Sequence, residues 1–250
     1  MNSDSESAYN IMVIVKKRNE EMFKYALFDL DGTLTDPKEG ITRSVQYALL
    51  HFGIKEENLD KLEGFIGPPL RDSFMLFYGL SPEQAEEAVA AYRERFGETG
   101  IFENIPYDNM AELLRSCKEA GMLLAVASSK PQIYVQRILE HFQLEQYFDA
   151  VVGSELDGTR EKKEEVVEEC LRQLEELVTG KGQTVLSQIF HHDNCCMIGD
   201  RKYDIEGGNR YGLYTIAVSY GYADEGELEA AGADRIVDSV KELKDALLKG

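Results

Sequence analysis

The stretch YALFDLDGTLTD, residues 25–36, places two aspartates at the end of an apolar run. Asp29 and Asp31 are separated by a single residue, and Gly32-Thr33 follows them. A short apolar run bounded by Asp-Gly is typical of a buried strand. Such a strand should not end on two like charges without a reason, because desolvated carboxylates repel one another and take up protons. A cation between them would remove the conflict.

The rest of the chain predicts an α/β fold around this strand. Most of the six apolar segments are separated by helical patterns, which lie at residues 108–121, 131–142 and 161–177. Alternating strands and helices predict a Rossmann-like parallel sheet with right-handed crossovers and helices on both faces. The near-continuous apolar character of the strands fits a sheet covered on both sides. The six segments begin at residues 25, 123, 150, 195, 214 and 235.

One interval breaks the alternation, because residues 37–105 contain helical patterns only. In SPEQAEEAVAAYRERF, residues 81–96, Ser81 is a candidate N-cap, Pro82 suits the first helical position and Gln84 completes a capping box. We predict a small α-helical cap at 37–105, inserted after the first strand into a core made of 22–36 and 106–250. This is the sheet edge where ligands bind in open α/β folds, so a lid there could exclude water.

Two further segments stand outside this pattern. Residues 1–21 are predicted to be a dispensable extension, with an added edge strand as the alternative. Residues 179–194 are predicted to be an inserted surface loop.

Composition limits the possible partners and compartment. The chain has 250 residues, with 27 Lys and Arg against 46 Asp and Glu, for a net charge of −19. This charge repels nucleic acid and anionic membranes, so we expect neither as a partner. The sequence shows no membrane span, no signal peptide and no disulfide spacing among its four cysteines. We expect a soluble cytoplasmic protein with reduced thiols, either a monomer or a weak homodimer.

Polar residues follow the ends of several predicted strands. Asp29 and Asp31 end the first, Ser128 ends the second, and Asp200 ends the strand at 195–199 with Asp204 four residues on. In a parallel sheet these ends lie at one edge, so the side chains should converge. Carboxylates are hard oxygen ligands for Mg²⁺, and lysine and hydroxyl groups neutralise phosphoryl oxygens. The pattern predicts a site for Mg²⁺ and a phosphate together.

The motifs of the chain resemble those of the haloacid dehalogenase superfamily of phosphatases. The resemblance spans residues 22–248 and rests on DLDGTLTD at 29–36, SSK at 128–130, a lysine ahead of EEVV at 164–167, and GDRKYD at 199–204. The first motif is highly specific, and the others are individually weak. FIGPPLRDSF at 65–74 and the segment 218–234 resemble the phosphoglycolate phosphatase-like branch, which also contains 5′-nucleotidases.

The resemblance implies a role for each motif residue. Asp29 would be the nucleophile, and Asp31 would be the general acid and base. Ser128 would bond a phosphoryl oxygen, and Lys163, favoured over Lys162, would pair with Asp29 and the phosphate. A side-chain carboxylate can act in this way by forming an aspartyl-phosphate.

The same resemblance implies a metal site and a substrate site. Asp29, Asp200 and the backbone carbonyl of Asp31 would bind Mg²⁺, while Asp204 would orient Lys163 or a metal-bound water. Substrate-binding residues are expected at four further positions, Thr33, Ser129, Lys130 and Arg71. Lys130 could meet the phosphate or the leaving group. Arg71 could clamp a second anionic group bidentately, or it could form a salt bridge with a cap glutamate instead.

A second possible metal cluster occurs in FHHDNCC, residues 190–196. His191 and His192 lie close in sequence to Cys195 and Cys196, as in some zinc sites. Adjacent residues of a strand point to opposite faces, so the two cysteines cannot easily serve one tetrahedral ion. Buried, apolar-like cysteines are the favoured interpretation.

These observations favour an Mg²⁺-dependent phosphatase, of the phosphoglycolate phosphatase-like type, that hydrolyses a small phosphorylated metabolite through an aspartyl-phosphate. Alternatives of the same fold are a 5′-nucleotidase, a pyrophosphatase and a phosphomutase, and product analysis separates the last from a hydrolase. A non-catalytic module that stores a phosphoryl group or binds a ligand is the other class. The helical insertion and the presence of both Asp29 and Asp31 count against it.

Overall fold

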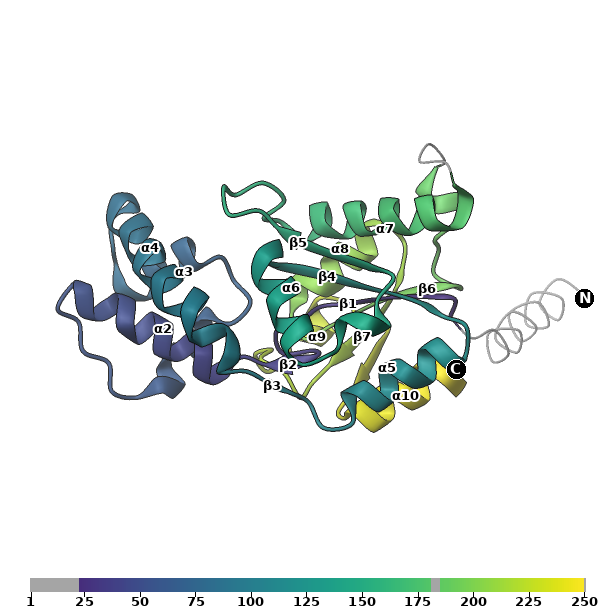
Figure 1. Ribbon diagram of the computed structural model, residues 1–250, viewed down its shortest axis with the longest axis horizontal. Helices are drawn as coiled ribbons and strands as arrows, with labels where there is room; N and C mark the ends of the chain where they lie inside the picture. The colour runs from purple at the N-terminus through teal and green to yellow at the C-terminus, as the bar shows by residue number, and fades with distance from the viewer. Residues whose placement is uncertain (1–22, 181–184, 250) are drawn as a thin grey trace, which may run out of the picture.

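The computed structural model describes residues 23–180 and 185–249 (Figure 1). The predicted extension at 1–21 and part of the 179–194 loop lie outside these residues. Six parallel strands form one sheet in the order β5-β4-β1-β6-β7-β8. All six predicted strands are present, as β1 (Tyr25–Phe28), β4 (Leu123–Pro131), β5 (Ala150–Ser154), β6 (Cys195–Gly199), β7 (Tyr214–Val218) and β8 (Arg235–Val237). The predicted parallel α/β sheet is confirmed.

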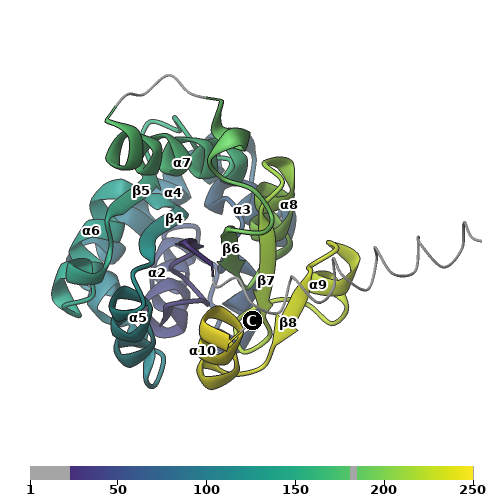
Figure 2. The same cartoon turned by 90° about the vertical axis from the view of Figure 1, so that its right-hand side faces the viewer.

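Helices cover both faces of this sheet, as Figure 2 shows. Alternate strand residues pack on opposite sides, with Phe28 in one buried cluster and Leu27 in the other. The first cluster includes apolar residues of α5 (Met110–Glu119), α6 (Gln132–His141) and α10 (Val240–Lys249). The second includes residues of α7 (Lys163–Thr179), beside which lies α8 (Lys202–Arg210). Burial on both faces explains why the strands are apolar throughout.

A group of helices lies beyond the carboxyl end of β1, at the left of Figure 1. The capping box predicted at Ser81 is present, since the Ser81 hydroxyl accepts from the Gln84 backbone N–H and the Gln84 side chain accepts from the Ser81 N–H. These helices are α2 (Lys38–His51), α3 (Leu70–Tyr78), α4 (Pro82–Glu98) and the 3₁₀ segments η1 (Leu59–Phe65) and η2 (Gly100–Phe102).

Two short strands connect these helices to the sheet. The strands β2 (Thr35–Asp36) and β3 (Ile105–Pro106) pair in antiparallel orientation. The sequence predicted only helices in this interval, because a strand of two residues is too short to show a period. This pairing holds the segment that leaves the sheet after β1 beside the segment that returns to it from the helical group.

The end of the 179–194 segment differs from the predicted surface loop. Phe190 is buried and packs edge-on against Tyr25, with 4.8 Å between ring centroids. Cys195 and Cys196 fall in different buried clusters, on opposite faces of β6, as expected. Burial raises the pKa of both thiols well above the usual range. Among the described residues all four cysteines are free, and His191 and His192 form no metal-binding group with them.

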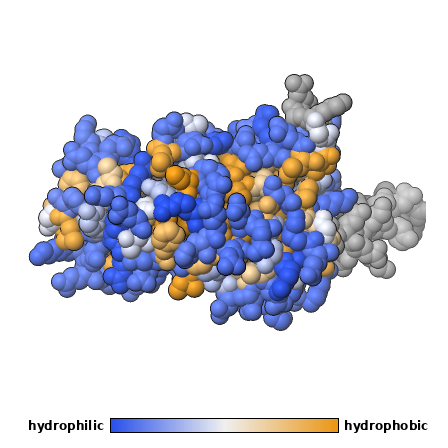
Figure 3. Space-filling view, viewed as in Figure 1, coloured by the Kyte–Doolittle hydropathy of each residue, from blue (hydrophilic) through white to orange (hydrophobic). Residues whose placement is uncertain are grey.

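The surface is largely polar. Figure 3 shows hydrophilic residues over most of one face, with apolar groups scattered among them. In residues 23–180 and 185–249, every helix is too short or too polar to cross a membrane.

Candidate active site

The strand order brings the predicted polar strand ends together. The strand β1 lies between β4 and β6 and pairs in parallel with both, with Phe28 opposite Val126 and Ile198. Asp29 directly follows β1, and Asp200 directly follows β6, so their carboxylates lie at the same sheet edge. The convergence predicted from the sequence is therefore a feature of the fold.

Three carboxylates form a buried cluster at this edge. Ligand oxygens of Asp29, Asp200 and Asp204 all lie within 4.8 Å of one another. Burial raises the pKa of Asp200 well above its usual range, and the negative charges of Asp204 and Asp29 add to the effect. Burial also raises the pKa of Asp204, to about 6. A divalent cation could occupy this cluster, because it would offset both the desolvation and the repulsion.

Lys163 supplies a positive charge beside the cluster. Its ammonium lies 2.8 Å from Asp29 Oδ1 and 2.7 Å from Asp204 Oδ1, and it donates to the Ala127 carbonyl oxygen at 3.0 Å. Burial alone would lower the pKa of Lys163, but the two carboxylates outweigh it and the pKa is raised. Its neighbour Lys162 is exposed to solvent, so of the two lysines weighed in the sequence it is Lys163 that enters the cluster.

Asp31 lies apart from the three-carboxylate cluster and pairs with Lys130. Burial raises the pKa of Asp31, although Lys130 opposes the shift. Asp31 Oδ1 is buried and has no hydrogen-bond partner among the described residues. The Lys130 ammonium also lies over the Phe96 ring of α4, 4.7 Å from its centroid. Asp31 is thus a buried carboxyl with one oxygen free for a ligand, and its partner lysine contacts the helical group.

Asp200 is fixed by residues that the sequence did not single out for this role. The backbone N–H of Tyr222 donates to Asp200 Oδ2 at 2.8 Å. A Cβ at Gly221 would lie 2.3 Å from Asp200 Cβ, and one at Gly32 would lie 2.1 Å from Asp200 Oδ2. Only glycine fits at these close approaches. The sequence could have indicated this contact through Gly221, because a glycine shortly after β7 lies at the same sheet edge as Asp200.

The other predicted substrate-binding residues lie in different surroundings. Thr33 is fully buried, and its hydroxyl donates to Asp200 Oδ1 at 3.5 Å rather than lining the pocket. Ser128 is also buried but lines the pocket, and its hydroxyl accepts from the Lys130 backbone N–H at 3.3 Å. The Ser129 carbonyl accepts from the Ser154 hydroxyl at 2.8 Å. Thr33 therefore contacts an aspartate of the carboxylate cluster, and Ser128 faces the cavity.

Known proteins resemble this chain in sequence and in fold. The profile of the haloacid dehalogenase-like hydrolases matches residues 26–218. The chain belongs to this family. It is 48% identical over 204 residues to a 5′-nucleotidase of Pseudomonas aeruginosa, covering 82% of this chain and 86% of that one. The solved structure of a predicted phosphatase from Clostridium acetobutylicum matches with a TM-score of 0.79 and 45% identity, over 90% of this chain and 98% of that one.

A third relative carries a different name. The chain is 34% identical over 223 residues to the tyrosine-protein kinase PtkA of Mycobacterium tuberculosis, covering 88% of this chain and 71% of that one. The family match, the 5′-nucleotidase and the predicted phosphatase together make this haloacid dehalogenase-like protein a hydrolase of the phosphatase type.

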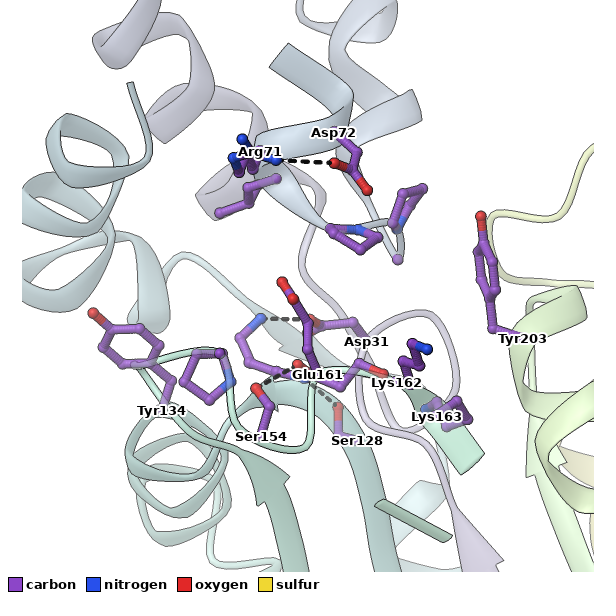
Figure 4. Close-up of a pocket in the computed structure, with 18 of the residues that line it drawn as sticks. Asp31, Arg71, Asp72, Ser128, Tyr134, Ser154, Glu161, Lys162, Lys163 and Tyr203 are labelled. Atoms are coloured by element: carbon purple, nitrogen blue, oxygen red, sulfur yellow. Dashed lines mark hydrogen bonds and ion pairs between the residues drawn. The ribbon is translucent and has the colours of Figure 1, made fainter. Parts of the chain in front are cut away.

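The site of this hydrolase opens into a pocket of about 680 Å³ between the sheet edge and the helical group (Figure 4). Residues of both regions line it. Arg71 of α3 lies across the pocket from Asp31, and it pairs with Glu86 of α4 at 2.7 Å and lies 4.0 Å from Asp72. Of the two roles that the sequence left open for Arg71, the ion pair with a glutamate is the one formed here.

Proposed function

We propose that the protein is an Mg²⁺-dependent phosphomonoesterase that acts through an aspartyl-phosphate on Asp29. The observation that carries the proposal is the contact between Asp29 and Lys163 at the floor of a pocket that also holds Asp31. A carboxylate held by an ammonium is ready to attack a phosphorus atom, while a second buried carboxyl is at hand to move protons.

Each residue has one task in the proposed reaction. The Asp29 carboxylate attacks phosphorus, the P–O bond to the leaving group breaks, and an acyl phosphate forms on Asp29. Burial raises the pKa of Asp31, which favours the protonated form, and in the proposed reaction this carboxyl gives a proton to the departing oxygen. Asp31, now a carboxylate, then takes a proton from the water that attacks the acyl phosphate. Phosphate leaves, and Asp29 and Asp31 return to their starting states.

Lys163 and Ser128 would hold the phosphoryl oxygens during both transfers. The Lys163 ammonium already contacts Asp29, so a phosphoryl group on that carboxylate would lie within its reach. Ser128 lines the same cavity with its hydroxyl. Electrostatic contacts of this kind stabilise charge that develops in the transition state.

The carboxylate cluster fits a magnesium ion. Asp29, Asp200 and Asp204 are all buried, and among the described residues Lys163 forms ion pairs with Asp29 and Asp204, while Asp200 has none. When bound, Mg²⁺ would neutralise charge on the transferred phosphoryl group. The sequence placed Asp204 outside the ligand set; we propose that it holds Lys163 and borders the ion.

We propose that residues 37–105 act as a cap over this pocket, with β2 and β3 as its connections to the core. For the substrate, we propose nucleoside monophosphates ahead of the phosphoglycolate expected from the sequence, and the 48% identity to a 5′-nucleotidase supports this order. A transfer to an acceptor other than water, as in a phosphomutase, would use the same Asp29 chemistry and differ in its product.

A panel of phosphomonoesters tests this function. Wild-type protein should release phosphate from at least one ester when Mg²⁺ is present and should lose this activity in EDTA. Asp29→Asn should reduce the rate by several orders of magnitude, because the nucleophile is gone. Full activity in Asp29→Asn would contradict the nucleophile, and appearance of a phosphorylated product in place of free phosphate would favour a mutase.

A further inference from the structure

The pocket outside the phosphoryl centre is lined by more acids than bases. Three of its acids form ion pairs: Glu86 and Asp72 pair with Arg71 at 2.7 Å and 4.0 Å, and Glu155 pairs with Arg160 at 2.6 Å. Four further carboxylates line the same pocket, namely Asp157, Glu161, Glu164 and Glu206. This is the part of the pocket that the leaving group of a substrate would enter.

The cations of this region are largely engaged already. Arg71 is paired with Glu86, and Arg201 is paired with Glu227 at 2.9 Å. Arg93 donates to the Leu156 carbonyl oxygen at 3.2 Å. The Arg71 pair is half-exposed and contributes little to stability, but it still cancels the field of Arg71 in the pocket. Outside the phosphoryl centre, Lys162 and Arg93 are the two lining cations that form no ion pair among the described residues, and the Lys162 side chain is exposed.

The position of Glu161 shows how this charge meets a ligand. Figure 4 shows the Glu161 side chain extending into the space below the Arg71–Asp72 pair, close to Asp31 in the view. A second anionic group on a substrate would enter this space against the acidic lining and against the net charge of −19. Glu161 and Glu206 are exposed to solvent, so salt screens their repulsion of an anionic group, which is greatest at low ionic strength.

The size and remaining walls of the pocket indicate what would fit instead. A volume of about 680 Å³ is within the range of pockets that bury nucleotide-sized ligands. Tyr134 and Tyr203 stand on opposite sides of the pocket in Figure 4, and both are half-buried. Phe96 packs edge-on against Tyr134, with 5.4 Å between centroids. Such walls suit a bulky leaving group with flat apolar surface.

We infer that the phosphate is the only anionic group of the substrate, and that the leaving group is a bulky alcohol or phenol that is uncharged or cationic. The inference rests on the proposed phosphomonoesterase function and narrows its substrate. It favours esters of the nucleoside type. It counts against phosphoglycolate and pyrophosphate, whose leaving groups carry a second negative charge.

Two aryl phosphates of nearly equal shape, which differ in the charge of the leaving group, test this inference. The 4-carbamoylphenyl ester carries an uncharged substituent, and the 4-carboxyphenyl ester carries an anionic one. Their dissociation constants are measured by calorimetry with the unreactive variant Asp29→Asn, which keeps the whole pocket outside the nucleophile. We expect the uncharged ester to bind about tenfold more tightly at low salt, with the difference shrinking as ionic strength rises. Equal binding, or tighter binding of the carboxylated ester, overturns the inference.

A pair of variants tests whether the pocket carboxylates are the cause. Combining Glu161→Gln and Glu206→Gln in the Asp29→Asn background should reduce the binding ratio severalfold. Combining Glu225→Gln and Glu229→Gln changes the net charge equally at exposed positions outside the pocket, and the ratio should stay the same. If both double substitutions reduced the binding ratio equally, the preference would come from the overall charge of the protein, and the role of the pocket carboxylates would be overturned. Because binding is measured without turnover, failure of the proposed function, seen as absent phosphate release in wild type, is a separate result.

Discussion

Arg201 Nη1 donates a hydrogen bond of 2.7 Å to the carbonyl oxygen of Ile66, so a side chain from the sheet edge holds the loop that leads into α3. Arg201 is buried, directly follows Asp200, and pairs with Glu227. The Gly67 backbone packs closely on the same side chain, since a Cβ there would lie 3.2 Å from Arg201 Cγ. The position of the loop that leads into α3 is therefore tied to the residue next to the carboxylate cluster.

Replacing this arginine should loosen the loop over the pocket. For Arg201→Met we expect KM to rise by about tenfold, with a smaller change in kcat, because the loop carries lining residues and not the reacting groups. Initial-rate kinetics on the preferred ester measure both constants. The neighbouring exposed Lys202→Met should behave as wild type. A fall in kcat alone would place Arg201 in the chemistry instead of the cap contact.

Lys163 and Lys162 offer a matched pair of adjacent lysines. Lys163→Met should lower kcat by roughly 10²- to 10³-fold, because it removes the cation that contacts both Asp29 and Asp204. Lys162→Met should keep kcat within a few-fold, since that side chain is exposed. Phosphate-release assays at saturating Mg²⁺ compare the two. If Lys162→Met were the more damaged variant, the assignment of the phosphate-binding lysine would be wrong.

Magnesium should stabilise the folded protein through the carboxylate cluster. A ligand that binds only the native state raises stability by about 2.7 kcal/mol at one hundred times its Kd. We expect Mg²⁺ to raise the midpoint of thermal unfolding in wild type and to raise it far less in Asp200→Asn, which keeps the size of the side chain. Glu229→Gln, an exposed change outside the pocket, controls for general charge effects. An equal shift in all three proteins would place the ion elsewhere.

The part of the site that could be predicted is the part built by strand ends. Asp29, Ser128 and Asp200 each close an apolar run, and parallel strands must place such ends at one edge. Sheet order was not needed for that conclusion, although the position of β1 between β4 and β6 makes the convergence tight. The capping box at Ser81 was visible for the same reason, because it depends on local spacing only.

The contacts that could not be predicted are made by loops and backbone groups. The bond from the Tyr222 N–H to Asp200 involves a group that every residue but proline carries, so no residue type reveals it. The contact of Arg201 with Ile66 joins residues that are 135 positions apart. Ile66 lies in a loop, where no repeating hydrophobic pattern indicates which residues it meets. Thr33 lies in the recognised motif, yet its hydroxyl turns to Asp200 because the chain reverses at Gly32, where φ is +79°.

The central claim is that Asp29 carries the phosphoryl group. The variant Asp31→Asn lacks the general base that activates water, so the acyl phosphate on Asp29 should break down slowly. An ester with a good leaving group needs no proton from Asp31, so the acyl phosphate should still form from it. The acyl phosphate should therefore accumulate in this variant. Acid quenching during turnover of such an ester in Mg²⁺, followed by peptide mass spectrometry, should find one added phosphoryl group on Asp29, labile to hydroxylamine. Continued turnover in Asp31→Asn with Asp29 unmodified, or a phosphoryl group on another residue, would contradict the account.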